Sequence, residues 1–368
     1  MASIQKRPNG KWRARADRDA YGKEPTRHFA RKADAQRWLD EMTAAVVTGQ
    51  YVDPKAGRET VRQYGERWRQ MQHHRPGTAA LYERLLRLHV YPVLGDLSLK
   101  NVRHSHARAF VSGLSRGLAP NTARQVHAVT RTIFRSAVAD KLIAETAFQK
   151  IPLQKVERGE VRPPSVADVR RLVQHAPERL EALLILAAGS GLRSGEMLGL
   201  TVDRVDFLRR EVRVDRQLVY VPGTAPVFGP PKTPESRRLV PIPQWVADAL
   251  AAHLAAFPAG EDGLIFQADK GGPILRTSLN GRWRQTVARA GMDVGLHLHH
   301  LRHGYASWLN AGGVPFTTVM ELLGHAPQGV TWTTYTHRVE GWDRQVRSVL
   351  DEAWRAAFAD SMRTGEAL

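Results

Sequence analysis

The pattern of hydrophobic and polar positions predicts short strands at the start of the chain, followed by a helix. Residues 3–7 and 11–17 flank Pro8-Asn9-Gly10, and Asn-Gly is the strongest short signal for a hairpin turn. Residues 25–30 can add a third strand. Apolar side chains then recur at helical spacing between residues 33 and 47. We therefore expect a three-stranded sheet with one helix in a domain spanning residues 1–50.

Apolar residues at helical spacing predict helices between residues 58 and 148, in a domain that we place at 58–150. Thr60 can cap the first helix, and residues 78–90, 105–114 and 121–139 supply the others. The last of these helices has apolar residues along one face. Its arginines lie elsewhere on the helix, at Arg124, Arg131 and Arg135.

Residues 151–164 are predicted to link this helical domain to a second one. The prolines in this stretch interrupt helix, and its charged residues offer few side chains for a core. Ser165 and Asp168 then have the spacing of a capping box, with Asp in place of the usual Glu. The second domain therefore spans residues 165–368.

The C-terminal domain has a mixed pattern of helix and strand. Residues 180–188 predict a buried helix, and residues 211–221 and 237–241 predict strands. After residue 341 an apolar stripe at helical spacing predicts a helix that either packs within its own subunit or docks on a neighbouring one. The expected fold class is α+β and mainly α, with a small antiparallel sheet in a mostly helical C-terminal domain.

The composition indicates a nucleic-acid partner. The chain has 54 Lys and Arg residues against 36 Asp and Glu residues, a net charge of +18 and a sequence pI of about 10.6. Most of the excess positive charge lies in residues 1–157. Such a charge is typical of a DNA-binding surface, and a highly charged solvated surface is the alternative.

Cysteine is absent from the chain, which excludes disulfides, thiolate nucleophiles and cysteine-ligated zinc. No stretch approaches 18 consecutive apolar residues, and the N-terminus has no apolar run of signal-peptide length. We therefore expect a protein that neither spans a membrane nor is secreted, and that works in the cytoplasm in association with the nucleoid.

Arginines, histidines and a tyrosine in the C-terminal domain suit attack on a phosphodiester. The planar fork of arginine matches the charged oxygens of a phosphoryl group in transfer, so Arg193 and Arg302 are candidates to clamp a phosphate. A tyrosine hydroxyl can act as the nucleophile and hold the phosphoryl group covalently. Tyr335 is the candidate, because Tyr305 lies in a segment typical of a core whereas residues 331–337 are polar.

These residues and their neighbours resemble the tyrosine recombinases, or phage integrases. Residues 191–196, Gly-Leu-Arg-Ser-Gly-Glu, are similar to the first arginine box of that family, and residues 322–325, Leu-Leu-Gly-His, are similar to its third. Tyr335 follows His325 by ten residues where nine is usual, and one extra residue in the turn-like stretch 326–329 would absorb the difference. The residues that match the catalytic set of the family are Arg193, Lys232, His299, Arg302, His325 and Tyr335.

The resemblance implies a role for each of these side chains. Tyr335 attacks the scissile phosphate and leaves a 3′-phosphotyrosyl link and a free 5′ hydroxyl. His299 and His325 donate hydrogen bonds to phosphate oxygens, and Lys232 protonates the departing 5′ oxygen. A loop lysine taken alone is usually only solvated. Because the energy of the phosphodiester is kept in the covalent link, no ATP, metal or other cofactor is expected.

Two further residues are expected to support the site. Glu196 can hold the Arg193 guanidinium through a charge-assisted hydrogen bond, although solvation of the surface is the alternative. His303 is expected to pack or to support the helix that carries Arg302. The four imidazoles between residues 297 and 303 also suggest a metal site, but Arg302 would place a permanent positive charge beside the ion.

The resemblance also assigns the N-terminal half. Residues 1–50 resemble the arm-binding domain of many phage integrases, and residues 58–150 resemble the core-binding domain that closes over DNA. A solvated sheet face and an ordinary helical bundle are the respective alternatives. The side chains expected to contact DNA are Lys11, Arg13 and Arg15 on one strand and Arg124, Arg131 and Arg135 on one helix.

The expected function is site-specific recombination of double-stranded DNA attachment sites, for integration or excision of a mobile element. We expect a homotetramer on DNA, with a directionality factor or a DNA-bending protein as a candidate partner. A type IB topoisomerase uses the same nucleophile and arginines but rejoins the original ends, and the arm-like N-terminal domain favours recombination. The residues are also compatible with a catalytically idle DNA-binding regulator or a metal-dependent nuclease.

Overall fold

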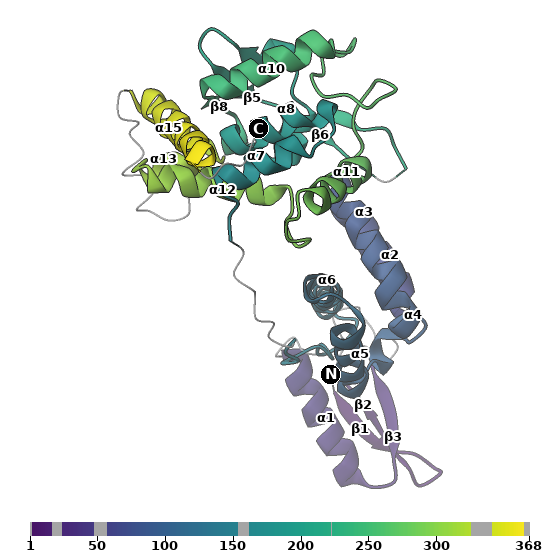
Figure 1. Ribbon diagram of the computed structural model, residues 1–368. Helices are drawn as coiled ribbons and strands as arrows, with labels where there is room; N and C mark the ends of the chain where they lie inside the picture. The colour runs from purple at the N-terminus through teal and green to yellow at the C-terminus, as the bar shows by residue number, and fades with distance from the viewer. Residues whose placement is uncertain are drawn as a thin grey trace. The chain divides into compact units, whose positions relative to one another are not determined.

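The computed structural model describes residues 2–16, 24–47, 57–153, 162–221, 223–324 and 341–363. The chain divides into two compact units, Met1–Arg158 and Gly159–Leu368, and the division falls inside the predicted linker. Among the described residues, helices predominate and the strands form small antiparallel sheets (Figure 1), which confirms the predicted fold class. In this part of the chain no helix has both the length and the apolar character needed to cross a membrane.

The chain begins with a three-stranded antiparallel sheet and one helix (purple in Figure 1). Strands β1 (Ser3–Lys6), β2 (Trp12–Arg15) and β3 (Thr26–Phe29) pair in that order, and α1 (Lys32–Val47) covers one face. Gly10 has a φ of +77°, which suits the left-handed conformation that the turn after β1 requires. Buried Ala14 and Ala35 lie at the contact between sheet and helix. The predicted hairpin, third strand and helix are therefore confirmed.

The rest of the N-terminal unit is helical, as predicted. Thr60 caps the first helix in a capping box with Gln63, which satisfies two backbone N–H groups. The predicted helix at 78–90 starts earlier and ends in a π-helical turn just before Pro92, whose ring removes one N–H from the helical ladder. The helices and helical turns are α2 (Val61–Met71), α3 (Pro76–Leu85), η1 (Leu86–Val90), α4 (Tyr91–Leu94), η2 (Leu99–Asn101), α5 (His104–Gly117) and α6 (Pro120–Ala139).

The C-terminal unit packs its helices around a buried central one. Ser165 caps its first helix in a capping box with Asp168, as its spacing predicts. The apolar helix α8 contacts α7, α10 and α12. The helices of this unit are α7 (Val166–Gln174), α8 (Glu178–Ser190), α9 (Ser194–Leu198), η3 (Val202–Arg204), η4 (Pro234–Ser236), α10 (Gln244–Ala256), α11 (Arg276–Arg289), α12 (His299–Ala311), α13 (Phe316–Leu322) and α15 (Trp342–Arg363).

In the described part of the C-terminal unit the strands form two sheets. Strands β4 (Val205–Asp206), β5 (Glu211–Val214) and β8 (Arg238–Pro241) make one sheet, and β6 (Gln217–Val219) pairs with β7 (Val227–Gly229) in the other. The single strand predicted at 211–221 is therefore wrong, because the chain leaves the first sheet between β5 and β6. Asp215, in that break, accepts hydrogen bonds from Arg204 at 2.9 and 3.0 Å.

The C-terminal helix α15 packs within its own subunit. Val346 and Leu350 are buried in a cluster with residues of α12 and α13, beside which α15 (yellow) lies in Figure 1. Trp354 stacks on Trp245 of α10, with ring centroids 4.2 Å apart and planes within 6°. Of the two arrangements considered for the apolar stripe, the described chain therefore shows packing in cis.

Candidate active site

The predicted residue Arg193 is positioned by the turn between α8 and α9. Helix α8 ends at Gly191, whose φ of +60° is left-handed, and a Cβ there would lie 2.5 Å from the Tyr305 ring. Arg193 then serves as the N-cap residue of α9. Glycine at 191 is therefore required both by the backbone conformation and by the close approach of α12.

Glu196 holds Arg193 in place, through the contact that its spacing predicts. The Arg193 Nη1 donates to Glu196 Oε1 at 2.8 Å, and the Arg193 backbone N–H donates to Oε2 at 2.9 Å. The same guanidinium donates to Ser236 Oγ at 3.2 Å and to the Gly324 carbonyl at 2.7 Å. Its side chain is 24% exposed, so the fork is fixed by protein groups while part of it faces outward.

Arg302 lies on α12, on the side of the helix that faces the core. Nη1 donates to the Gly191 carbonyl at 2.7 Å, and Nη2 donates to the Leu323 carbonyl at 2.5 Å. Burial and repulsion from the nearby guanidinium groups of Arg193 and Arg238 lower the pKa of Arg302 to about 9. The side chain stays charged at neutral pH, in surroundings where an added anion would be electrostatically favourable.

Arg193 and Arg302 therefore come together, although 109 positions separate them in the chain. Arg193 donates to the carbonyl of Gly324, and Arg302 donates to the carbonyl of the preceding residue, Leu323. The Arg193 charge also contributes to lowering the pKa of Arg302. The structure therefore brings two guanidinium groups from distant parts of the chain to neighbouring carbonyls at the end of α13.

Arg238 is a member of this site that the sequence reasoning missed. It lies on β8, buried, and donates from Nη2 to Glu196 Oε2 at 2.9 Å. Burial alone would raise the pKa of Glu196, but the charge and hydrogen bonds of Arg238 and the hydrogen bonds of Arg193 hold it below its ordinary value. The sequence pattern could have indicated its burial. Side chains alternate between the two faces of a strand, and Arg238 lies two positions from the buried Val240 of β8, so both lie on the same face.

His299 and His303 lie one turn apart on the exposed side of α12. Their rings meet edge to face, with centroids 5.0 Å apart. Partial desolvation, together with repulsion from His303, Arg302 and Arg193, lowers the pKa of His299 to about 4. His299 is therefore neutral at pH 7 and carries one N–H. His299 lines a pocket of about 200 Å³ together with polar residues such as Ser194 and Asn280 and with several apolar residues.

Of the remaining predicted residues, one has no stated contact with Arg193 or Arg302, and two lie in ranges that the structure does not describe. Lys232 is exposed in the connection between β7 and η4, rather than at the tip of a hairpin between two paired strands. His325 and Tyr335 lie outside the described residues. Tyr305 is fully buried in a core cluster, where burial raises the pKa of its hydroxyl, so it is a poor nucleophile.

The histidines at and near the start of α12 do not form a metal site with other described residues. His300 Nδ1 accepts a hydrogen bond from the His297 backbone N–H at 3.0 Å, and so is used locally at the start of the helix. Within the described ranges no three His, Asp or Glu side chains are placed to hold an ion together.

The residues predicted to contact DNA lie on two separate surfaces of the N-terminal unit. Arg13 and Arg15 alternate on β2 with buried Ala14, so they point away from α1, and Lys11 precedes them in the same register. Repulsion from Arg7 is the largest cause that lowers the pKa of Arg13, which reflects the density of positive charge there.

On α6 the three arginines are seven and four residues apart, so they share one face. Arg124 and Arg131 are half-buried, and Arg135 is exposed. The opposite side of the helix supplies buried residues such as Val126 and Ile133 to the core. This helix therefore presents a basic stripe while it remains anchored by its apolar face.

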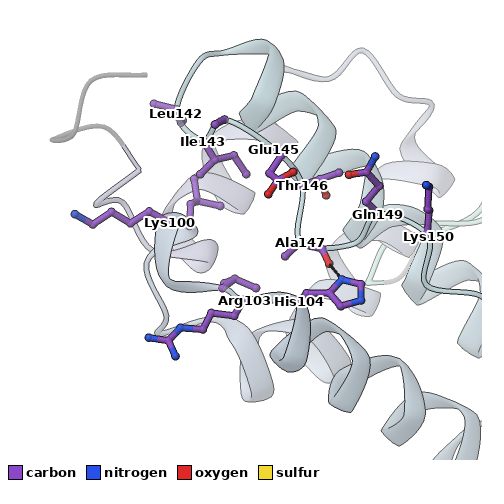
Figure 2. Close-up of a pocket in the computed structure, with 13 residues that line it drawn as sticks. Lys100, Arg103, His104, Leu142, Ile143, Glu145, Thr146, Ala147, Gln149 and Lys150 are labelled. Carbon is purple, nitrogen blue, oxygen red and sulfur yellow. Dashed lines mark hydrogen bonds between the residues drawn. The ribbon is translucent and has the colours of Figure 1, made fainter. Parts of the chain in front are cut away.

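A pocket of about 760 Å³ lies in the N-terminal unit, between residues 99–104 and 142–150 (Figure 2). Two of its polar side chains make local hydrogen bonds. Figure 2 shows the His104 ring directed at Ala147, whose carbonyl lies 3.1 Å from Nδ1, and Thr146 Oγ1 accepts from the Phe148 backbone N–H at 3.2 Å. The pocket contains none of the residues predicted to be catalytic, and no nucleophile in it contacts a base.

Comparisons with known proteins find similar sequences over both units of the chain. Residues 165–340 match the domain described as Phage integrase family, and residues 60–115 match the Phage integrase, N-terminal SAM-like domain. A tyrosine recombinase XerC-like protein of Caldanaerobacter subterraneus is 31% identical over 60% of this chain and 63% of its own length. A putative prophage phiRv2 integrase of Mycobacterium tuberculosis is 25% identical over 88% of both chains.

The fold also matches a solved structure. The Tn1549 transposon integrase, in complex with a circular intermediate DNA, superposes with a TM-score of 0.67 and 21% sequence identity. The match covers 79% of this chain and 99% of that one.

Proposed function

Since the chain belongs to the phage integrase family, we propose that it is a site-specific DNA recombinase that cuts and rejoins strands through a 3′-phosphotyrosyl intermediate. The observation that carries the proposal is the convergence of Arg193 and Arg302 on consecutive backbone carbonyls. Donors held in place before the reaction stabilise developing charge without reorganisation. An anion with several oxygens, such as a phosphodiester, fits these two forks.

The proposed reaction is a transesterification at phosphorus. The Tyr335 oxygen gives up its proton to solvent and forms a bond to the scissile phosphorus as the bond to the 5′ oxygen breaks. Lys232 supplies the proton that the 5′ oxygen takes up and regains one from solvent. Arg193 and Arg302 bind the non-bridging oxygens. Neutral His299 donates its single N–H to one of them, and His325 is proposed to donate likewise. The free 5′ hydroxyl of a partner strand then attacks the phosphotyrosine and releases Tyr335.

The proposed substrate is a pair of double-stranded DNA attachment sites, in the integration or excision of a mobile element. Four strands are cut in such an exchange, and one nucleophile is used for each, so a homotetramer on DNA is proposed. The N-terminal domains would grip the duplex through the basic faces of β2 and α6. A DNA substrate would place the protein with the nucleoid in the cytoplasm, and a directionality or DNA-bending factor is a candidate partner.

The proposal is tested by following strands between two marked duplexes. Duplexes that the protein binds are first selected from a random-sequence library, and two such duplexes of different length carry different fluorophores. We expect products that join one label to the other. If every label stays on its original duplex while a supercoiled plasmid carrying the selected sequence is relaxed, the result would instead identify a topoisomerase. Cleavage that requires divalent cations would identify a nuclease. Binding without any cleavage would contradict all three enzymatic functions.

A further inference from the structure

Three consecutive carbonyls at the end of α13 each accept a hydrogen bond from a different arginine. Arg238 Nε donates to the Leu322 carbonyl at 2.5 Å. Arg302 donates to the next carbonyl, that of Leu323, and Arg193 donates to the one after it, that of Gly324. The short segment 322–324 is thus the common partner of three guanidinium groups that come from β8, α12 and the start of α9.

Arg238 is buried, as is Arg302, and all three of its guanidinium nitrogens donate to protein groups. Its side chain is 3% exposed, and it bridges the Glu196 carboxylate, the Ser236 carbonyl at 2.8 Å and the Leu322 carbonyl. Because its nitrogens are all used in these contacts, we assign Arg238 no contact with DNA. Through Glu196 it touches the group that orients Arg193, and through residue 322 it touches the segment to which Arg193 and Arg302 are bonded.

The packing around Arg238 leaves little room for another arrangement. Gly324 has a φ of +62°, and a Cβ at this position would lie 2.9 Å from Arg238 Nη1. Stability alone does not explain the buried pair of Arg238 and Glu196, because apolar residues of similar volume often replace such pairs without loss. The planar shape of the guanidinium group explains why an arginine is used here, since one side chain donates to a carboxylate and two carbonyls in fixed directions.

We propose that Arg238 is a positioning residue for strand cleavage. It holds residues 322–324 and Glu196 in the one arrangement in which Arg193 and Arg302 present their forks together. The inference rests on the proposed function and deepens it, because it adds a residue that acts through the two arginines rather than on DNA. Misplacement of reacting or binding groups by about 1 Å costs on the order of a hundredfold in rate.

The test compares Arg238→Lys with Arg237→Lys, which changes the exposed neighbouring arginine in the same way. Lysine keeps the charge but cannot bond the carboxylate and both carbonyls at once. The probe is a nicked duplex, selected by binding, on which a cut strand stays attached to the protein. With DNA at saturation, we expect Arg238→Lys to form the covalent complex at least about tenfold more slowly. Its dissociation constant for DNA should stay within about threefold of wild type, and Arg237→Lys should resemble wild type.

Thermal unfolding and a cooler assay separate positioning from stability. If the slow cleavage of Arg238→Lys came only from unfolding, it would recover at a temperature where the variant is fully folded, and that recovery would overturn the proposal. Arg238→Gln provides a second variant without the charge, and cleavage by it at the wild-type rate would also overturn the proposal. If wild type and Arg237→Lys form the covalent complex, the proposed function is supported independently of the results with Arg238→Lys and Arg238→Gln. Its absence in wild type would refute the proposed function itself.

Discussion

Replacing Glu196 by glutamine is expected to destabilise the C-terminal unit by several kcal/mol. The Glu196 side chain is 2% exposed and bonds Arg193 at 2.8 Å and Arg238 at 2.9 Å. Removing one partner of a buried ion pair leaves the other charge uncompensated and costs about 3–5 kcal/mol. Glutamine keeps the shape of the glutamate side chain and one of its oxygen acceptors, so we expect the lower end of this range, about 3 kcal/mol. That is a large fraction of the roughly 5–15 kcal/mol that stabilises a typical protein.

The effect should depend on pH with a defined sign. The folded-state pKa of Glu196 is below its ordinary value of 4.5, so the carboxylate contributes stability above that pH. The contribution is lost as the pH falls through the folded-state pKa. The free-energy difference between wild type and Glu196→Gln should therefore be full at pH 7 and should shrink below pH 4.5.

Hydrogen exchange during urea titration, read from peptides of α8 and α10, measures the stability of this unit separately from the other one. Asp203→Asn is the control, because Asp203 also meets two arginines but is 61% exposed. Such a surface pair contributes about 1 kcal/mol or less. Equal effects of the two substitutions, or a Glu196→Gln effect that does not change between pH 7 and pH 4, would refute the reasoning.

Three further outcomes are expected. Gly324→Ala should lower the melting temperature more than Gly313→Ala, because both have positive φ but only the first places a Cβ 2.9 Å from Arg238; equal shifts would contradict this. Leu350→Ala should cost about 2–5 kcal/mol in urea unfolding, since the residue is 1% exposed, and a cost below about 1 kcal/mol would argue against packing of α15 in cis. DNA affinity, measured by fluorescence anisotropy, should increase as the pH is lowered from 7 to 5, and it should increase more in wild type than in His299→Asn. The reason is that a bound phosphate would raise the pKa of His299 from about 4. Identical pH profiles of the two proteins would exclude contact between His299 and the phosphate.

Features that depend on neighbouring residues could be predicted from the sequence. The Asn9-Gly10 hairpin and the capping boxes at Thr60 and Ser165 involve partners only a few positions apart, so the local pattern contains all the information needed. The contact of Glu196 with Arg193 follows from a three-residue spacing in the same way.

Features that depend on distant packing could not be predicted in this way. The break between β5 and β6 is set by which strands become neighbours, and the strand-like pattern of residues 211–221 does not contain that information. The partner of Arg302 lies 111 residues upstream at Gly191, and that of Arg238 lies 84 residues downstream at Leu322. The family resemblance identified Arg302 but not Arg238, because Arg238 is not among the motif residues on which the resemblance rests.

The central claim is that Tyr335 becomes esterified to a DNA strand held by Arg193 and Arg302. The most direct measurement is mass spectrometry of peptides from the complex trapped on a nicked duplex selected by binding. We expect the nucleotide on Tyr335, and no trapped complex with Tyr335→Phe. A complex that persists in Tyr335→Phe, or a nucleotide attached to another residue such as Tyr305, would contradict the account.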